Sequence, residues 1–195
     1  MNKTISRKKK ILITTLVLLL LLLTASYFLY MEEQGNFHAI THGEAYRSAQ
    51  LDRDELEYYI NRYNIRSIIN LRGKHPDKPW YREEKEVSLI YGVRHYSVSL
   101  SSSFEPNEVV VRDLIEIYNN APRPVLIHCQ AGADRSGLAS AIWKVVIDKE
   151  SKSEAEKQLS ISYGHLPIGK TQAMDSFFRK WNPSQSYSAL VKGEK

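Results

Sequence analysis

Residues 124–137 read Pro124-Val-Leu-Ile-His-Cys-Gln-Ala-Gly-Ala-Asp-Arg-Ser-Gly137, and this stretch decides the predicted fold and chemistry. It joins an apolar, strand-like segment to an apolar, helix-like one at residues 138–147 through a loop of small residues. The only cysteine of the chain, Cys129, stands in this loop, and five residues separate it from Arg135. A buried strand that leads through such a loop into a helix predicts an α/β domain that binds its ligand at the carboxyl end of the strand.

The loop has the residue types that bind an anion. Backbone N–H groups between Gln130 and Arg135 can form an anion-binding nest, and a helix beginning near Ser136 would add the positive end of its dipole. The same field favours the thiolate form of Cys129, which is the nucleophilic form. The planar guanidinium of Arg135 matches two phosphate oxygens, which a lysine cannot do. We therefore expect phosphate to contact Gln130, Ala131, Gly132, Ala133, Asp134 and Arg135.

On these residues the chain resembles the cysteine-dependent protein tyrosine and dual-specificity phosphatases, whose signature is His-Cys, five residues, Arg, then Ser or Thr. Two earlier segments, Ala45-Tyr-Arg-Ser-Ala-Gln-Leu51 and Ile65-Arg-Ser-Ile-Ile-Asn-Leu-Arg72, extend the resemblance. They are similar to the start of the domain in small microbial and plant atypical dual-specificity phosphatases and in bacterial tyrosine and phosphoinositide phosphatases. The resemblance covers residues 37–181, and only the signature loop is highly specific.

The resemblance implies a two-step reaction that needs no metal and no cofactor. Cys129 attacks phosphorus to give a phosphocysteine, water then releases phosphate, and Arg135 with the loop amides stabilises the charge in both steps. Ser136 would donate a hydrogen bond to the departing thiolate, or would only cap the helix. His128 would fix the loop rather than transfer a proton. Metal ligation is not indicated, because the histidines show no close ligand pairing beyond His38 and His42.

The general acid is the open question of the site. Dual-specificity phosphatases carry an aspartate on a loop after the second strand, but this chain reads Val98-Ser-Leu-Ser-Ser-Ser-Phe-Glu-Pro106 there. One substitute is Asp134 in the signature loop, which resembles the Lys-Asp-Arg ending of some bacterial phosphatases although Ala133 replaces the lysine. The other is Glu105, which lies on the expected mobile loop or only begins the next helix as a first-turn acid.

The substrate also has alternatives. The resemblance implies hydrolysis of phosphate monoesters of the protein tyrosine or dual-specificity type, with a phosphorylated protein or a phospholipid as partner. Arg47 and Arg72 could form a cationic rim for a multiply phosphorylated substrate, which would suit a phosphoinositide or phospholipid phosphatase, or they could make structural ion pairs. A non-catalytic phosphate-binding module is the alternative from another class, and the missing upstream aspartate is its only support.

The N-terminal segment predicts a membrane anchor. Residues 11–30 are uncharged and mostly apolar, which is long enough as a helix for the roughly 30 Å hydrocarbon core of a bilayer. Basic residues precede the segment and Glu32 and Glu33 follow it, so the N-terminus is expected in the cytoplasm and the domain in a periplasm or extracellular space. A cleaved secretory signal with Thr24-Ala-Ser26 near its cleavage site is the alternative.

The charge balance argues against nucleic-acid binding. Of the 27 Lys and Arg residues, five lie within residues 1–31, which contain no Asp or Glu, so 22 basic residues face 22 acidic ones in the rest. The formal charge of +5 therefore belongs to the N-terminal segment, and the remainder is neutral. No basic patch with interleaved aromatic residues is present to bind nucleic acid.

The pattern along the chain predicts one α/β phosphatase domain with a central mixed sheet flanked by helices, preceded by one transmembrane helix. We expect a basic N-terminus at residues 1–10, the anchor at 11–30, the domain at 31–183 and a polar tail at 184–195. The predicted strands are residues 67–71, 94–100 and 125–127. The predicted helices are residues 52–64, with Asp52 as a cap, and residues 108–118, 138–148, 153–163 and 170–181.

Overall fold

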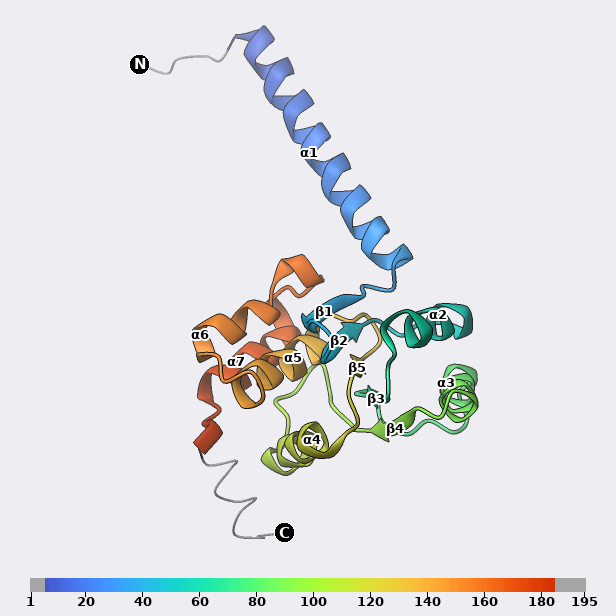
Figure 1. Cartoon of the computed structure of the whole chain (residues 1–195). Helices are drawn as coiled ribbons and strands as arrows, with labels where there is room; N and C mark the ends of the chain where they lie inside the picture. Colours follow the sequence, from blue (N-terminus) through green and yellow to red (C-terminus); the bar gives the residue numbers. More distant parts are fainter. Residues whose placement is uncertain (1–5, 185–195) are drawn as a thin grey trace. The chain divides into compact units, whose positions relative to one another are not determined.

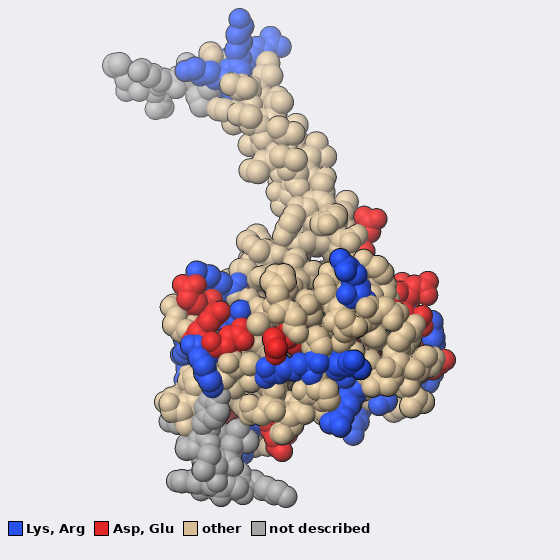
Figure 2. Space-filling model, in the orientation of Figure 1, with Lys and Arg blue, Asp and Glu red and all other residues tan. Residues whose placement is uncertain are grey.

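The structure, a computed structural model, describes residues 6–184, and the chain divides into two compact units, residues 1–34 and 35–195. The first unit consists of α1 (Arg7–Glu33), a single long helix. An 18-residue stretch within Arg7–Met31 has a mean hydropathy of 2.4, and none of its residues is buried. Figure 2 shows Lys and Arg side chains gathered at the start of this helix and residues without charge along most of it, which the sequence shows to be mostly apolar. The helix α1 is therefore a candidate membrane span that contains the predicted anchor.

The second unit is built on a five-stranded sheet in the order β1-β2-β5-β3-β4. Strands β2, β5, β3 and β4 are parallel, and only β1 pairs antiparallel with β2, so the predicted mixed sheet is confirmed. Strand β5 is the central strand, and its residues are buried because the sheet is covered on both faces, as in other parallel sheets. The strands are β1 (His38–Thr41), β2 (Ala45–Ser48), β3 (Ser67–Asn70), β4 (Arg94–Ser97) and β5 (Val125–His128).

Helices cover both faces of the sheet (Figure 1). Side chains alternate between the faces along a strand, so Ile68 and Leu126 pack with α2 (Arg53–Tyr63) and α3 (Pro79–Ile90). Their neighbours Ile69 and Ile127 pack on the other side, in the larger core. That core is completed by α4 (Glu108–Asn120), α5 (Asp134–Val146) and α7 (Gln172–Lys180).

Most of the predicted helices are confirmed with small shifts at their ends. Helix α2 begins after Asp52, whose side chain accepts a hydrogen bond from the backbone N–H of Glu55, while the Glu55 side chain accepts one from the backbone N–H of Asp52. This reciprocal pairing satisfies two N–H groups of the first turn. Helices α4 and α7 correspond to residues 108–118 and 170–181. Helix α5 starts earlier than predicted, at Asp134 instead of near Ser136.

The helix predicted at residues 153–163 is wrong. The structure has only α6 (Lys152–Ala155) there, followed by short 3₁₀ turns at Glu156–Gln158 and Ile161–Tyr163. The carbonyl of Gln158, which would continue an α-helix, instead accepts a hydrogen bond from the Arg47 side chain at 2.8 Å. The hydrophobic periodicity of residues 153–163 could not indicate this hydrogen bond, because its donor, Arg47, lies on a strand that is distant in the sequence.

Three elements were not predicted, and the strand at residues 94–100 is shorter than expected. Strands β1 and β2 have four residues each and lack a long apolar run, which weakens their sequence signal. Helix α3 turns Glu84 inward and leaves Leu89 and Ile90 exposed, so its pattern is not that of an ordinary amphipathic helix. Strand β4 ends at Ser97, and beyond it only one isolated bridge joins Ser99 to Arg72.

Candidate active site

The signature loop leaves the carboxyl end of the central strand β5 and enters α5 at Asp134. Strands β2 and β3 flank β5 in parallel, so the loop lies where three parallel strands end. Cys129 follows directly after β5 and is 2% exposed. The first turn of α5 leaves its N–H groups without acceptors inside the helix. An anion that enters this loop therefore meets a thiol, free N–H groups and the positive end of a helix dipole.

Gly132 allows the loop to approach the neighbouring strand. Its φ of +70° is in the left-handed region, and a Cβ there would lie 2.6 Å from the backbone nitrogen of Ala49 and 2.7 Å from the backbone carbon of Ser48. Any side chain at this position would force the loop away from the end of β2. The glycine is thus required by backbone packing as well as by its φ.

The Arg47 side chain binds the backbone carbonyl groups of the signature loop. Its Nη2 donates to the carbonyl oxygens of Gly132 at 2.9 Å and Ala133 at 3.0 Å. Since N–H and C=O point in opposite directions across a trans peptide, the N–H groups of Ala133 and Asp134 face away from Arg47, toward the loop interior. Burial lowers the pKa of Arg47 to about 10, so the side chain is still charged at neutral pH. Arg47 is fully buried, and the alternative that placed it on a cationic rim is therefore wrong.

Arg72 interacts electrostatically with both Arg135 and Cys129. Arg135 Nη1 donates to the Leu100 carbonyl at 3.5 Å, and within residues 6–184 its buried Nε has no acceptor. Burial and the charge of Arg135 both lower the pKa of Arg72, while Glu84 and Cys129 oppose the shift. The Arg72 guanidinium lies 3.6 Å from the ring centroid of Trp80 and is half-buried. Two guanidinium groups thus share one end of the sheet, which attracts anions.

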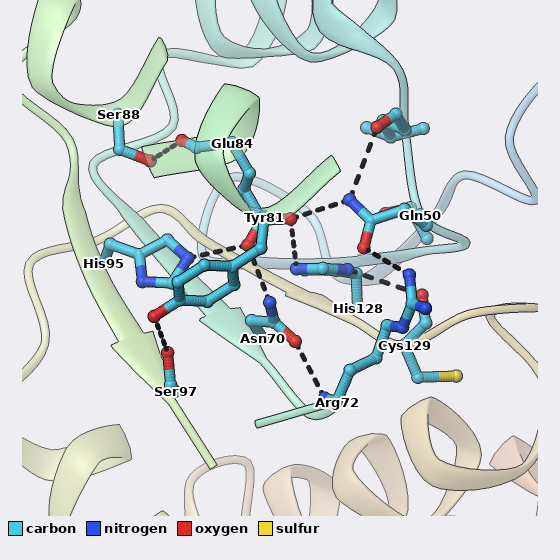
Figure 3. Close-up of polar contacts among 12 residues, drawn as sticks. Gln50, Asn70, Arg72, Tyr81, Glu84, Ser88, His95, Ser97, His128 and Cys129 are labelled. Carbon is cyan, nitrogen blue, oxygen red and sulfur yellow. Dashed lines mark hydrogen bonds and ion pairs between the residues drawn. The ribbon is translucent and has the colours of Figure 1, made fainter. Parts of the chain in front are cut away.

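Glu84 is the centre of a buried polar network next to the signature loop (Figure 3). His95 and Asn70 donate to its Oε1 at 2.6 Å and 2.8 Å. Gln50 donates to its Oε2 at 2.8 Å, and His128 Nε2 lies 3.0 Å from the same oxygen. Burial alone would raise the pKa of Glu84, but His128, His95 and Gln50 outweigh it and hold this pKa far below its usual range. Glu84 is therefore a carboxylate at neutral pH.

The Glu84 network connects the loop to Arg72. The backbone N–H of Gln50 donates to the Gln130 carbonyl at 3.1 Å, and its Oε1 accepts from Arg72 Nη1 at 3.1 Å. His128 Nδ1 lies 3.4 Å from the Cys129 carbonyl, while the sulfur of Cys129 points away from the network (Figure 3). The His128 ring thus lies between the signature loop and the Glu84 carboxylate, and its role in fixing the loop stays a prediction.

The two candidate acids lie in different surroundings. Asp134 begins α5, and its Oδ1 lies 2.7 Å from Nδ1 of His165. Glu105 is exposed on the segment between β4 and α4 and pairs with Lys180 at 2.7 Å. Ser136 is buried, with its hydroxyl 3.5 Å from the Ser48 carbonyl. Its alternative role as a helix cap is wrong, because Ala133 occupies the cap position of α5.

Sequence reasoning missed several polar residues that surround the loop. From the sequence, no role was predicted for Gln50, Glu84, His95, His165 or Asp175. Each is buried or half-buried, although most polar residues are exposed in proteins. The Asn-Leu-Arg motif at the end of β3 predicted only that Asn70 and Arg72 lie at the same edge as the loop, and it did not identify these five residues.

This fold and this loop define a cysteine-dependent phosphatase of the dual-specificity class. The chain belongs to the family described as DSP-PTPase phosphatase fused to NAD+ kinase, whose family model matches residues 31–180. The predicted membership in the cysteine-dependent tyrosine and dual-specificity phosphatases is therefore confirmed.

Two curated relatives match parts of the chain. A dual specificity protein phosphatase CDC14C from Symphalangus syndactylus is 25% identical over 117 residues, which is 60% of this chain and 23% of that protein. The inositol diphosphatase SIW14 of Saccharomyces cerevisiae is 28% identical over 100 residues, which is 49% of this chain and 34% of that protein. The chain thus matches about a quarter and a third of the lengths of these relatives.

Solved structures share the fold. The crystal structure of P. aeruginosa TpbA has a TM-score of 0.63 and 20% identity over 80% of this chain and 91% of its own. The core catalytic domain of the PP-IP phosphatase SIW14 from S. cerevisiae, in complex with citrate, has a TM-score of 0.63 and 22% identity over 81% of this chain and 92% of its own. A TpbA structure in complex with pTyr has a TM-score of 0.64.

Proposed function

We propose that the domain hydrolyses phosphate monoesters through a phosphocysteine at Cys129, as a protein tyrosine or dual-specificity phosphatase. The observation that carries this proposal is the placement of Cys129 at the end of β5, facing a loop whose carbonyls are held on the far side by Arg47. Arg135 and the loop amides would stabilise the charge of the phosphoryl group in both steps, and Ser136 would assist the departing thiolate. A non-catalytic phosphate-binding module would need the loop amides and Arg135 but no thiol facing them.

The basic test is metal-free turnover. Full-length protein in detergent should hydrolyse a small aryl phosphate, because the thiolate, the guanidinium and the amides supply the charge stabilisation. A chelator should leave the rate unchanged and vanadate should abolish it. Binding of phosphate without any turnover would instead support the non-catalytic alternative.

We propose Asp134 as the general acid, because it lies in the loop beside Arg135, whereas Glu105 is exposed and paired with Lys180. Asp134→Asn should slow hydrolysis of an alkyl phosphate by about 10²- to 10⁴-fold and that of a phosphate with a good phenol leaving group much less, since only the poor leaving group needs a proton. The matched variant Glu105→Gln should change neither rate by more than about threefold. Equal losses on both substrates would assign Asp134 to loop architecture, and a selective loss in Glu105→Gln would make Glu105 the acid.

The second candidate function, action on phosphoinositides or other multiply phosphorylated substrates, is favoured by Arg72 beside Arg135. SIW14 is named as an inositol diphosphatase, and TpbA has been solved with pTyr, so the relatives support both substrate classes. The decisive panel compares phosphotyrosine, phosphoserine and phosphothreonine peptides, inositol phosphates and membrane phospholipids. The family description names a fused NAD+ kinase, whose product carries a phosphate monoester, so a 2′-phosphorylated dinucleotide belongs in the same panel.

Arg72→Met tests the second phosphate contact. If Arg72 binds a second phosphate, kcat/KM for an inositol polyphosphate should fall roughly 10- to 100-fold, as expected for a lost hydrogen bond to a charged group. The value for a phosphotyrosine peptide should change by less than about threefold. Arg66→Met is the matched control, because Arg66 is exposed just before the start of the same strand, β3. A loss of equal size on both substrates would limit Arg72 to support of the loop.

We also propose that α1 is an uncleaved anchor with the basic end in the cytoplasm and the domain outside. A reporter that folds only after export, fused after Lys195, should be active, and added protease should digest the domain in spheroplasts. Replacement of the five basic residues of the N-terminus, Lys3, Arg7, Lys8, Lys9 and Lys10, by neutral residues should scramble the orientation. A protected domain would reverse the orientation, and a processed protein that starts near Ala25 would identify a cleaved signal.

A further inference from the structure

The loop aspartate, Asp134, is the first of three side chains that are linked by hydrogen bonds. His165 Nδ1 is 2.7 Å from Asp134 Oδ1, and His165 Nε2 is 2.9 Å from Asp175 Oδ2. The three residues come from the start of α5, from the turn between two 3₁₀ segments, and from α7. His165 is fully buried, Asp175 is 5% exposed, and Asp134 is partly open to solvent. Only Asp134 can therefore meet a substrate.

The contacts of His165 determine its protonation. A neutral imidazole has one N–H, so one of the two flanking carboxyl oxygens would face a lone pair. An imidazolium donates to Oδ1 of Asp134 and to Oδ2 of Asp175, also when Asp134 carries a proton on its other oxygen. Burial disfavours the charged ring, but the hydrogen bonds to Asp134 and Asp175 prevail and raise the pKa of His165 above its usual value. The other charged groups around this chain are Arg47, which interacts with Asp134, and Arg179, which interacts with Asp175.

We propose that His165, held by Asp175, is the positioning residue of the general acid Asp134. The imidazolium binds Oδ1 and leaves Oδ2 for the oxygen of the leaving group. The inference rests on the proposed function, because it assigns a partner to the acid of that reaction. Some bacterial phosphatases have a lysine directly before the loop aspartate, where this chain has Ala133. In this protein the His165 imidazolium, from another part of the fold, supplies the neighbouring positive charge.

The proton movements balance in both steps. In the first, the Cys129 sulfur bonds to phosphorus, the bond between phosphorus and the leaving oxygen breaks, and that oxygen takes the proton from Asp134 Oδ2. Asp134 becomes a carboxylate that the His165 imidazolium stabilises. In the second, water gives a proton back to Oδ2 while its oxygen attacks phosphorus, and the thiolate of Cys129 leaves with the electron pair of the broken S–P bond. His165 keeps both of its protons throughout.

Rates measured with good and poor leaving groups distinguish a positioning role of His165 from a purely structural one. In full-length protein, His165→Gln should lower kcat for an alkyl phosphate roughly 10- to 100-fold with little change in KM, and the rate for a good phenol leaving group much less. In an Asp134→Asn background the same substitution should cost almost nothing further, because the group that it positions is gone. His42→Gln is the matched control at an exposed histidine and should have no effect.

Two further measurements do not depend on a well-folded His165 variant. Nitrogen NMR of the wild-type protein should show both ring nitrogens of His165 protonated at pH 6.5. Because its pKa is raised, the imidazolium persists above pH 6.5 and is lost as pH rises through the folded value, so kcat for the alkyl phosphate should fall there. Asp175→Asn should move this fall to lower pH, since it removes one of the two carboxylates.

A neutral His165 at pH 6.5, equal losses on both leaving groups, or an undiminished effect in the Asp134→Asn background would each overturn the inference. These outcomes differ from failure of the proposed function. If the proposed function fails, the wild-type protein itself will show no Cys129-dependent turnover of the aryl phosphate.

Discussion

Cys129→Ser is expected to lower turnover of an aryl phosphate by at least about 10⁴-fold, the largest effect that any single substitution should have here. A serine hydroxyl in the same loop is not ionised at neutral pH, so the nucleophile is lost while the nest and Arg135 are retained. The variant should fold normally, because serine is close in size to the cysteine that it replaces at a site 2% exposed. The measurement is initial rate at saturating substrate in detergent-solubilised protein.

The control for this prediction is binding without turnover. The Cys129→Ser protein should still bind phosphate and should unfold within a few degrees of the wild type. Retention of more than about one per cent of the activity would show that another group attacks phosphorus. If Cys129→Ser lost both activity and fold, the test would use Arg135→Lys instead. This variant keeps the charge but not the planar guanidinium, and its activity should also be severely impaired.

Glu84→Gln is expected to lower the free energy of unfolding by about 3–5 kcal/mol at pH 7, a large part of the stability of an ordinary domain. The glutamine amide would bring two N–H donors toward His95, Asn70, Gln50 and His128, which already point donors at this site. It would also remove the charge that balances the two imidazole rings. Urea unfolding of residues 35–195, followed by circular dichroism, measures the change.

The lowered pKa of Glu84 also predicts how its contribution to stability changes with pH. The pKa of Glu84 is lowered in the folded protein, so its stabilising contribution is present above the ordinary value of 4.5 and is lost as pH falls from there toward the folded value. The difference between the wild type and Glu84→Gln should therefore shrink below about pH 4.5. Glu83→Gln on the same helix is the matched control, because Glu83 is exposed. A loss that is equal in both variants would contradict a special role for Glu84.

The local sequence predicted the parts of the protein that depend on neighbours in the chain. The run from Pro124 to Gly137 predicted the strand, the loop and the helix, because apolar periodicity, a small-residue loop and the Cys-Arg spacing are local. Asp52 was recognised as a cap for the same reason, since a capping box is closed within one turn. The apolar run at residues 11–30 likewise predicted a helix long enough to span a membrane.

The side chains that support the site can be identified only from their contacts in the folded protein. Arg47 is separated from Gly132 by 85 positions in the chain, and its contact with that carbonyl exists only because β2 and β5 are neighbours in the sheet. Glu84 and His165 looked like ordinary polar residues, because a sequence shows charge but not burial. Their roles arise where the packing of α3 and α7 removes water and leaves each polar group a single set of partners. The signature loop and the candidate anchor can thus be recognised from local sequence, whereas the distant charges that hold the loop are visible only in the fold, since buried charges are stable only with partners that the fold brings to them.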